Sequence, residues 1–126
     1  MVKRKVIHVK GLTHDNPIPI AVKIENMLYT SSIIGYNPET GELPDKVEKE
    51  VEYIFNYIKE ILREAEGTTE DIAHFRVSVT DRKYKEVVNV QWLKMFPDQN
   101  NRPARHTVVR DLKKGVRIQI EIVAVL

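Results

Sequence analysis

Apolar residues recur with helical spacing between Asp45 and Glu66, and this is the strongest periodic pattern in the chain. The residues that share one face are Val47, Val51, Ile54, Phe55, Ile58, Ile61, Leu62 and Ala65. Their spacing predicts an amphipathic helix of about five to six turns. We expect Asp45, directly after Pro44, to be the N-cap and Gly67 to be a left-handed C-cap residue.

A second helix is predicted from Lys83 to Phe96, where apolar and aromatic residues can share a buried face. We expect Asp81 to cap its start, and Pro97 to end it because proline cannot continue a helix. Between the two helices, Thr68–Asp71 predicts a single turn. The alternation of Phe75–Thr80 that follows predicts a strand.

Five further segments are expected to be β-strands. The N-terminal stretch Lys3–Lys10 lacks clean alternation and is typical of an edge strand. Ala21–Glu25 and Met27–Ile34 are rich in β-branched and aromatic residues and form a predicted hairpin. After the second helix, we expect strands at His106–Arg110 and Val116–Leu126, joined by a turn.

The last strand divides its side chains between two faces. One face carries Val116, Ile118, Ile120, Ile122 and Ala124, and the other carries Arg117, Gln119, Glu121 and Val123. The predicted order β-β-β-α-β-α-β-β gives an α+β fold, a mixed sheet with two helices packed on one face. We expect the open face to carry also Ser31 or Ser32 beside Ile33. A face of this mixed polarity is often buried against another subunit, which predicts a homo-oligomer.

The composition indicates one domain spanning residues 1–126. With 126 residues, 42% of them hydrophobic, the chain is long enough for a single core. A net charge of +2 is too small to argue for nucleic acid or a membrane as a partner. The absence of cysteine excludes disulfides, and the N-terminus lacks the apolar run of a signal peptide or anchor, so we expect a cytoplasmic protein.

Two charged residues near the C-terminus are candidates for binding or chemistry. Arg105 follows Pro103-Ala104, and its guanidinium fork matches a carboxylate through two parallel hydrogen bonds. Glu121 lies between two isoleucines of the last strand, where a carboxylate needs a partner, so it could hold or activate a water. Local sequence also allows simpler interpretations, an exposed arginine at a strand start and a salt-bridged or solvated glutamate.

Other polar residues form no recognisable catalytic motif. The four histidines lack metal-ligand spacing, so no metal is expected. His106 follows Arg105, but neighbours in a strand point to opposite faces, so the two should not share a pocket. Ser31 and Ser32 have no paired histidine in a nucleophile motif. Asn89 is an amide among apolar helix residues, which is more often a surface residue than a ligand.

Several segments resemble the RidA (YjgF) family in order and spacing. Its C-terminal signature is matched by Pro103–Val108, Leu112–Gly115 and Ile118–Val125. Leu28–Ser31 matches the strand that precedes the family's Ser-Gly-Gln motif. Asn37–Leu43 matches the family's turn, and Val87–Asn89 matches its helical Val-Asn segment. The resemblance extends from about Pro17 to the C-terminus.

This resemblance implies a chorismate-mutase-like α+β subunit of a homotrimer, with clefts between neighbouring subunits. Members of the family hydrolyse reactive enamines and imines without a metal or cofactor, which is coherent because an imine is already electrophilic. By resemblance, Arg105 would bind the substrate carboxylate, and the backbone carbonyl of Thr107 would position a water together with Glu121. Ser31 and Asn89 match positions that line the cleft or its interface.

The chain departs from the family pattern at three positions. Ile18 stands where the family has a tyrosine, Ser32 where it has a glycine, and Ile33 where it has a polar amide. Ile18 and Ser32 are expected at the substrate-binding wall. We therefore expect a more apolar cleft, suited to a different or bulkier imino acid, or to binding without fast turnover.

Three functions are compatible with this sequence. The first is a deaminase that hydrolyses 2-imino or enamine acids to 2-keto acids and ammonia. The second is a non-catalytic trimer that binds a 2-keto acid or a similar small carboxylate. The third, also attached to the family, is ribonuclease activity or translation inhibition, for which the small net charge gives little support.

Overall fold

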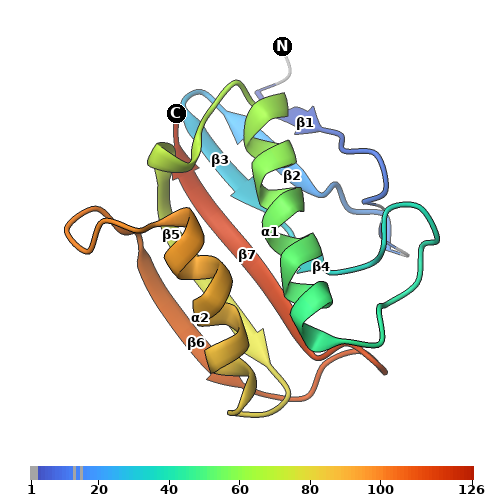
Figure 1. Cartoon of the computed structure of the whole chain (residues 1–126). Helices are drawn as coiled ribbons and strands as arrows, with labels where there is room; N and C mark the ends of the chain where they lie inside the picture. Colours follow the sequence, from blue (N-terminus) through green and yellow to red (C-terminus); the bar gives the residue numbers. More distant parts are fainter. Residues whose placement is uncertain (1–2, 13, 15) are drawn as a thin grey trace.

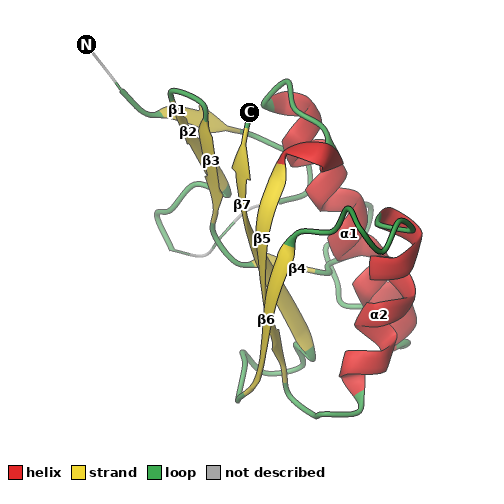
Figure 2. Ribbon diagram, turned by 90° about the vertical axis from the view of Figure 1, so that its left-hand side faces the viewer, coloured by secondary structure: helices red, strands yellow, loops and turns green. Residues whose placement is uncertain are grey.

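Two helices pack on one face of a seven-stranded mixed sheet, which confirms the predicted α+β fold (Figure 1 and Figure 2). The computed structural model describes residues 3–12, 14 and 16–126. The elements are β1 (Lys5–Ile7), β2 (Ala21–Ile24), β3 (Met27–Thr30), β4 (Ile33–Ile34), α1 (Val47–Glu64), the 3-10 helix η1 (Thr69–Asp71), β5 (Ile72–Val79), α2 (Tyr84–Met95), β6 (Ala104–Val109) and β7 (Ile118–Val125). Within the described ranges, no helix is long and apolar enough to cross a membrane.

The C-terminal strand β7 lies in the middle of the sheet. The strand order is β1-β2-β3-β7-β5-β6, and β4 also pairs with β7. Strands β5 and β6 run parallel, whereas the other neighbours are antiparallel. Helix α2 forms the crossover between the two parallel strands, because strands that run in the same direction need a long connection. This arrangement makes β6 an edge strand.

The hydrophobic core lies between the helix layer and the sheet layer; Figure 2 shows these two layers side by side. Ile54 and Ile58 of α1 and Ile118 and Ile120 of β7 are fully buried there. The alternate residues of β7 lie on the face without helices and are partly exposed; these are Gln119, Glu121 and Val123. The two faces predicted for the last strand are therefore confirmed from Ile118 to Ala124. Arg117, predicted on the open face, lies before β7, and its Nε donates to the buried Glu50 of α1 instead.

The predicted strand Met27–Ile34 is two strands, because a β-bulge interrupts it. Strand β3 pairs with β7 as far as Tyr29 opposite Val123, and pairing resumes in β4 with Ile33 opposite Ile120. Between these pairs, the three residues 30–32 face only two residues of β7, Glu121 and Ile122. One extra residue in a strand is the defining feature of a bulge, and it reverses the alternation of side chains after it.

The bulge sends Ile33 into the core. Its side chain is fully buried, as is that of Leu28 before the bulge. The expectation that Ile33 lies on the open face and on the wall of a cleft is wrong. The side chain of Thr30 partly repairs the interrupted ladder, since its Oγ1 accepts a hydrogen bond from the N–H of Ile122 at 2.9 Å.

Both helices begin later than the sequence predicts. The N-cap of α1 is Lys46, and the carbonyl of Asp45 instead accepts a hydrogen bond from Nη1 of Arg117 at 2.9 Å. The N-cap of α2 is Lys83, whose own N–H donates to Oδ1 of Asp81 at 2.9 Å in the preceding turn. Asp45 and Asp81 are therefore not the capping residues. The single turn predicted between the helices is confirmed as η1, which begins with a capping box.

The chain leaves α1 through a Schellman motif in which Glu66, not Gly67, is left-handed. Glu66 has a φ of 63°, and its N–H donates to the carbonyl of Arg63 at 3.0 Å. The N–H of Gly67 donates to the carbonyl of Leu62 at 2.7 Å, which completes the motif. Gly67 serves close packing instead, since a Cβ there would lie 2.5 Å from Cδ2 of Leu126.

Replacing Glu66 with glycine is expected to raise the free energy of unfolding by about 0.5–1 kcal/mol, because glycine adopts a left-handed conformation without a Cβ clash. The matched control is Glu64→Gly at the last residue of α1, where helix propensity predicts a loss of about 1 kcal/mol. Urea unfolding of both variants measures the difference. If the free energy of unfolding changes with the same sign in both variants, Glu66 is not the left-handed residue that ends α1.

Candidate functional site

Arg105 lies on the helix-covered side of the edge strand β6. It stands opposite Phe75 in the parallel register with β5, and Phe75 is fully buried beneath the helices. His106, the next residue, stands opposite Arg76 on the open face. The prediction that Arg105 and His106 point to opposite faces is therefore confirmed.

Three neighbours hold the guanidinium of Arg105. Its Nε donates a hydrogen bond to Oγ1 of Thr107 at 3.0 Å, and its Nη1 donates to Oδ1 of Asn89 at 2.8 Å. Its Cζ lies 5.2 Å from the ring centroid of Trp92, a cation–π distance. Burial lowers the pKa of Arg105, but an arginine stays protonated at neutral pH. The alternative of a freely exposed arginine is wrong, and Asn89 is a partner of Arg105 rather than a free surface amide.

Trp92 is a member of this site that the sequence interpretation assigned only to the core. It packs edge-on against Phe75, with ring centroids 5.0 Å apart, and against Phe96, with centroids 4.9 Å apart. These contacts fix the ring on which the guanidinium lies. One sequence signal could have found it: Trp92 follows Asn89 by three residues, so the two share a helix face. We call Asn89, Trp92, Arg105 and Thr107 the arginine group.

Glu121 lies on the opposite face of the sheet from the arginine group. It stands opposite Arg76 in the register of β5 and β7, and its side chain is partly exposed. A shallow pocket of about 170 Å³ surrounds it, lined also by Tyr29, His74 and Val123. One chain therefore does not bring Arg105 and Glu121 together, and a site that uses both needs a second copy of the chain.

Ser31 and Ser32 form the bulge that faces Glu121 and its neighbour on β7. The Oγ of Ser31 donates a hydrogen bond to the carbonyl of Pro19 at 2.7 Å, which ties the loop before β2 to the bulge. Ile18, the residue before Pro19, is 47% exposed. Of the predicted site residues, Asn89 and Thr107 thus contact Arg105, whereas Glu121 lies across the sheet from them.

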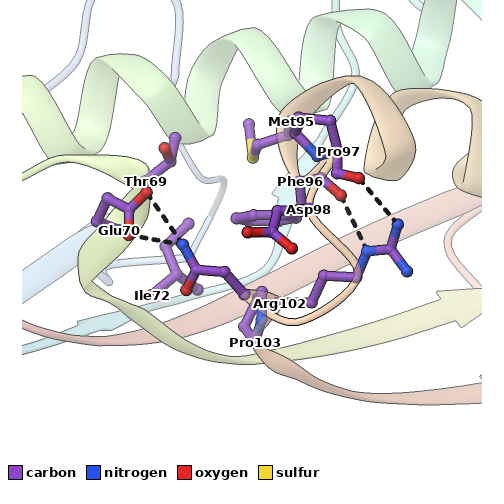
Figure 3. A pocket seen from close by; sticks show the side chains of 10 residues that line it. Thr69, Glu70, Ile72, Met95, Phe96, Pro97, Asp98, Arg102 and Pro103 are labelled. Atoms are coloured by element: carbon purple, nitrogen blue, oxygen red, sulfur yellow. Dashed lines mark hydrogen bonds between the residues drawn. The ribbon is translucent and has the colours of Figure 1, made fainter.

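A separate cavity of about 300 Å³ lies between η1 and the loop that follows α2 (Figure 3). Several of its polar side chains bond to each other or to the loop backbone. Glu70 accepts hydrogen bonds from Nδ2 of Asn101 at 3.0 and 3.3 Å, and Nε of Arg102 donates to the carbonyl of Phe96 at 2.9 Å. These bonds tie the loop that follows α2 to itself and to η1.

The fold and the arginine group define a small α+β protein with a half-buried arginine, a residue type whose guanidinium matches an anionic group such as a carboxylate. The family model described as Endoribonuclease L-PSP matches residues 14–126. The chain belongs to this family, the RidA (YjgF) family, which confirms the resemblance noted in the sequence.

Individual relatives agree with this assignment. A RutC family protein of Aquifex aeolicus is 38% identical over 116 residues, covering 86% of this chain and 92% of that protein. The 2-iminobutanoate/2-iminopropanoate deaminase of Escherichia coli is 35% identical over 111 residues, covering 86% and 87%. The crystal structure of RidA from the Antarctic bacterium Psychrobacter superimposes with a TM-score of 0.89 at 32% identity, covering 98% of this chain and all of that one.

Proposed function

We propose that this protein hydrolyses 2-imino acids, or their enamine tautomers, to 2-keto acids and ammonia at clefts between the subunits of a homotrimer. The observation that carries the proposal is the arginine group, which holds Arg105 half-buried and charged, with Nη2 making no hydrogen bond to any residue that the structure describes. Such an arginine matches the carboxylate of a small acid. The similarity to an E. coli protein named as a 2-iminobutanoate/2-iminopropanoate deaminase supports the reaction.

The proposed chemistry needs one placed substrate and one placed water. Arg105 binds the carboxylate, and Glu121 of another subunit accepts a proton from a water that also donates to the backbone carbonyl of Thr107. The water oxygen bonds to the imine carbon as the carbon–nitrogen π bond breaks, and Glu121 passes the proton taken from the water to the nitrogen, which gives a carbinolamine. Glu121 then accepts the hydroxyl proton as the carbonyl forms and the carbon–nitrogen bond breaks, and it passes this proton to the nitrogen, so ammonia leaves and the 2-keto acid remains.

The open face of the sheet supports the proposed trimer. Tyr29 is 48% exposed there and Val125 is 43% exposed, and both flank Val123 on the sheet. An apolar and partly polar face of this kind is suited to burial against another copy of the chain. Packing through it would bring Glu121 of one subunit toward the arginine group of a neighbour.

Ile18 gives the proposed cleft an apolar wall. Its side chain is exposed in the single chain, so a substrate can reach it, and it offers no hydrogen-bond donor. We therefore propose that the substrate carries an aliphatic side chain longer than that of alanine.

Mixing two inactive variants tests the shared site. Arg105→Ala and Glu121→Gln subunits are each expected to lack activity on freshly generated 2-iminobutanoate. Refolding them together at a 1:1 ratio should restore about one quarter of the wild-type activity, because one half of the subunits supplies each intact group at a cyclic interface. A mixture that stays as inactive as its components would contradict a site built from two subunits.

A second candidate function is non-catalytic binding of a 2-keto acid. One observation favours it: the arginine group is complete within a single chain and does not include Glu121. Binding of 2-oxobutanoate by the wild type, with keto-acid release from the imine no faster than the spontaneous reaction, would select this function over the deaminase.

A further inference from the structure

We infer that the hydroxyl of Thr107 decides how Arg105 holds its ligand, so that the carboxylate is bound end-on by Nη1 and Nη2. This inference rests on the proposed carboxylate site but adds a role for a side chain whose backbone carbonyl alone was assigned to the reaction. Thr107 is then a positioning residue, since it acts through Arg105.

An arginine can grip a carboxylate with two parallel hydrogen bonds in two ways. The side-on grip uses the N–H of Nε and one N–H of Nη2, whereas the end-on grip uses one N–H from each of Nη1 and Nη2. In this chain the N–H of Nε is donated to Oγ1 of Thr107 at 3.0 Å. The side-on grip is therefore closed, because Nε has a single hydrogen.

The other contacts leave the end-on grip available. Asn89 accepts one hydrogen bond from Nη1, which has two hydrogens. Within the described part of the chain, Nη2 donates no hydrogen bond, so both of its hydrogens are free for a ligand. The ring of Trp92 makes a cation–π contact with the guanidinium, whose Cζ lies 5.2 Å from the ring centroid. Together these contacts prepare the tip of the side chain for a planar carboxylate.

The end-on grip places the ligand at the tip of Arg105, farther from β6 than a side-on grip would. That position suits a cleft whose second wall comes from another copy of the chain. Threonine and valine have nearly the same shape, but only threonine supplies the acceptor, so the hydroxyl can be tested without changing the strand.

Binding of 2-oxobutanoate, measured by calorimetry, tests the inference without requiring catalysis. Thr107→Val should raise Kd about tenfold, because Nε is released and the fork can rotate. Thr107→Ser, which keeps the hydroxyl, should bind within about twofold of the wild type. The NMR signal of the Arg105 Nε–H should exchange faster with water in Thr107→Val and not in Thr107→Ser. A Thr107→Val variant that binds as tightly as the wild type overturns the inference.

Making Thr107→Val in an Arg105→Lys variant tests whether the hydroxyl acts on ligand binding through the guanidinium. Lysine has no fork to orient, so Thr107→Val should change Kd less than about twofold there. An equal tenfold loss in both backgrounds would show that Thr107 acts on the strand rather than on the guanidinium, and would overturn the inference. If the Thr107 variants change Kd as expected but the wild type does not hydrolyse the imine, only the proposed deaminase is refuted. A wild type that does not bind 2-oxobutanoate refutes both.

Discussion

Replacing Arg105 with alanine is expected to lower kcat/KM for 2-iminobutanoate hydrolysis about 100- to 1000-fold. The half-buried guanidinium supplies the only cation of the arginine group, and loss of a sheltered charged partner costs about 2–5 kcal/mol, with each 1.4 kcal/mol worth about tenfold. Keto-acid release above the spontaneous rate is the measurement.

Two variants control this experiment. Arg105→Lys keeps the charge but loses the fork, so it should retain about tenfold more activity than Arg105→Ala. Arg102→Ala removes an arginine three residues earlier, whose side chain donates to loop carbonyls and not to the arginine group, and kcat/KM should stay within about twofold of the wild type. If Arg105→Ala retains wild-type activity, Arg105 does not bind the substrate.

Replacing Glu50 with alanine is expected to lower the free energy of unfolding by about 3–5 kcal/mol. Glu50 is fully buried in the first turns of α1. Its Oε1 accepts a hydrogen bond from Nε of Arg117 at 2.7 Å, and its Oε2 accepts from the N–H groups of Arg117 and Ile118 at 3.0 and 3.3 Å. Removing the carboxylate leaves a guanidinium and two backbone donors without their acceptor.

Urea unfolding at several protein concentrations measures this effect, since subunit association would also contribute to stability. Glu48→Ala is the matched control, because Glu48 lies in the same first turn of α1 but is exposed, and its loss should stay within about 0.5 kcal/mol. A loss below about 1 kcal/mol for Glu50→Ala would show that the buried pair contributes little. Gly35 belongs to the same packing, since a Cβ there would lie 2.2 Å from the carbonyl oxygen of Glu50.

The buried pair also shows a limit of pattern reading. Glu50 lies four residues before Ile54, on the apolar stripe of α1, where a charged residue signals a buried partner. The partner, Arg117, is 67 residues away along the chain. No local pattern identifies which of many arginines it is, because the pairing follows from the packing of α1 against the start of β7.

The family resemblance predicted the candidate residues other than Trp92 and a cleft between neighbouring subunits, but not the face of the sheet on which each residue lies. Arg105 and Glu121 both belong to matched C-terminal segments, so they are close in the sequence. The parallel register of β5 and β6 places Arg105 opposite Phe75, whereas the antiparallel register of β5 and β7 places Glu121 opposite Arg76. Adjacent positions on β5 point to opposite faces, so the two residues are separated by the sheet.

Helical and strand periodicity are local properties of α1, β5 and β7, so the sequence alone predicts these elements and the sides that they bury. How the elements meet follows from their packing in the folded chain. The bulge at Ser31-Ser32 turned Ile33 into the core, and α2 laid Asn89 and Trp92 against Arg105. The first depends on pairing register and the second on contact between distant segments, and neither leaves a periodic signal in the chain. The left-handed residue at Glu66 is set by the local hydrogen bonds of the Schellman motif, which hydrophobic periodicity does not mark either.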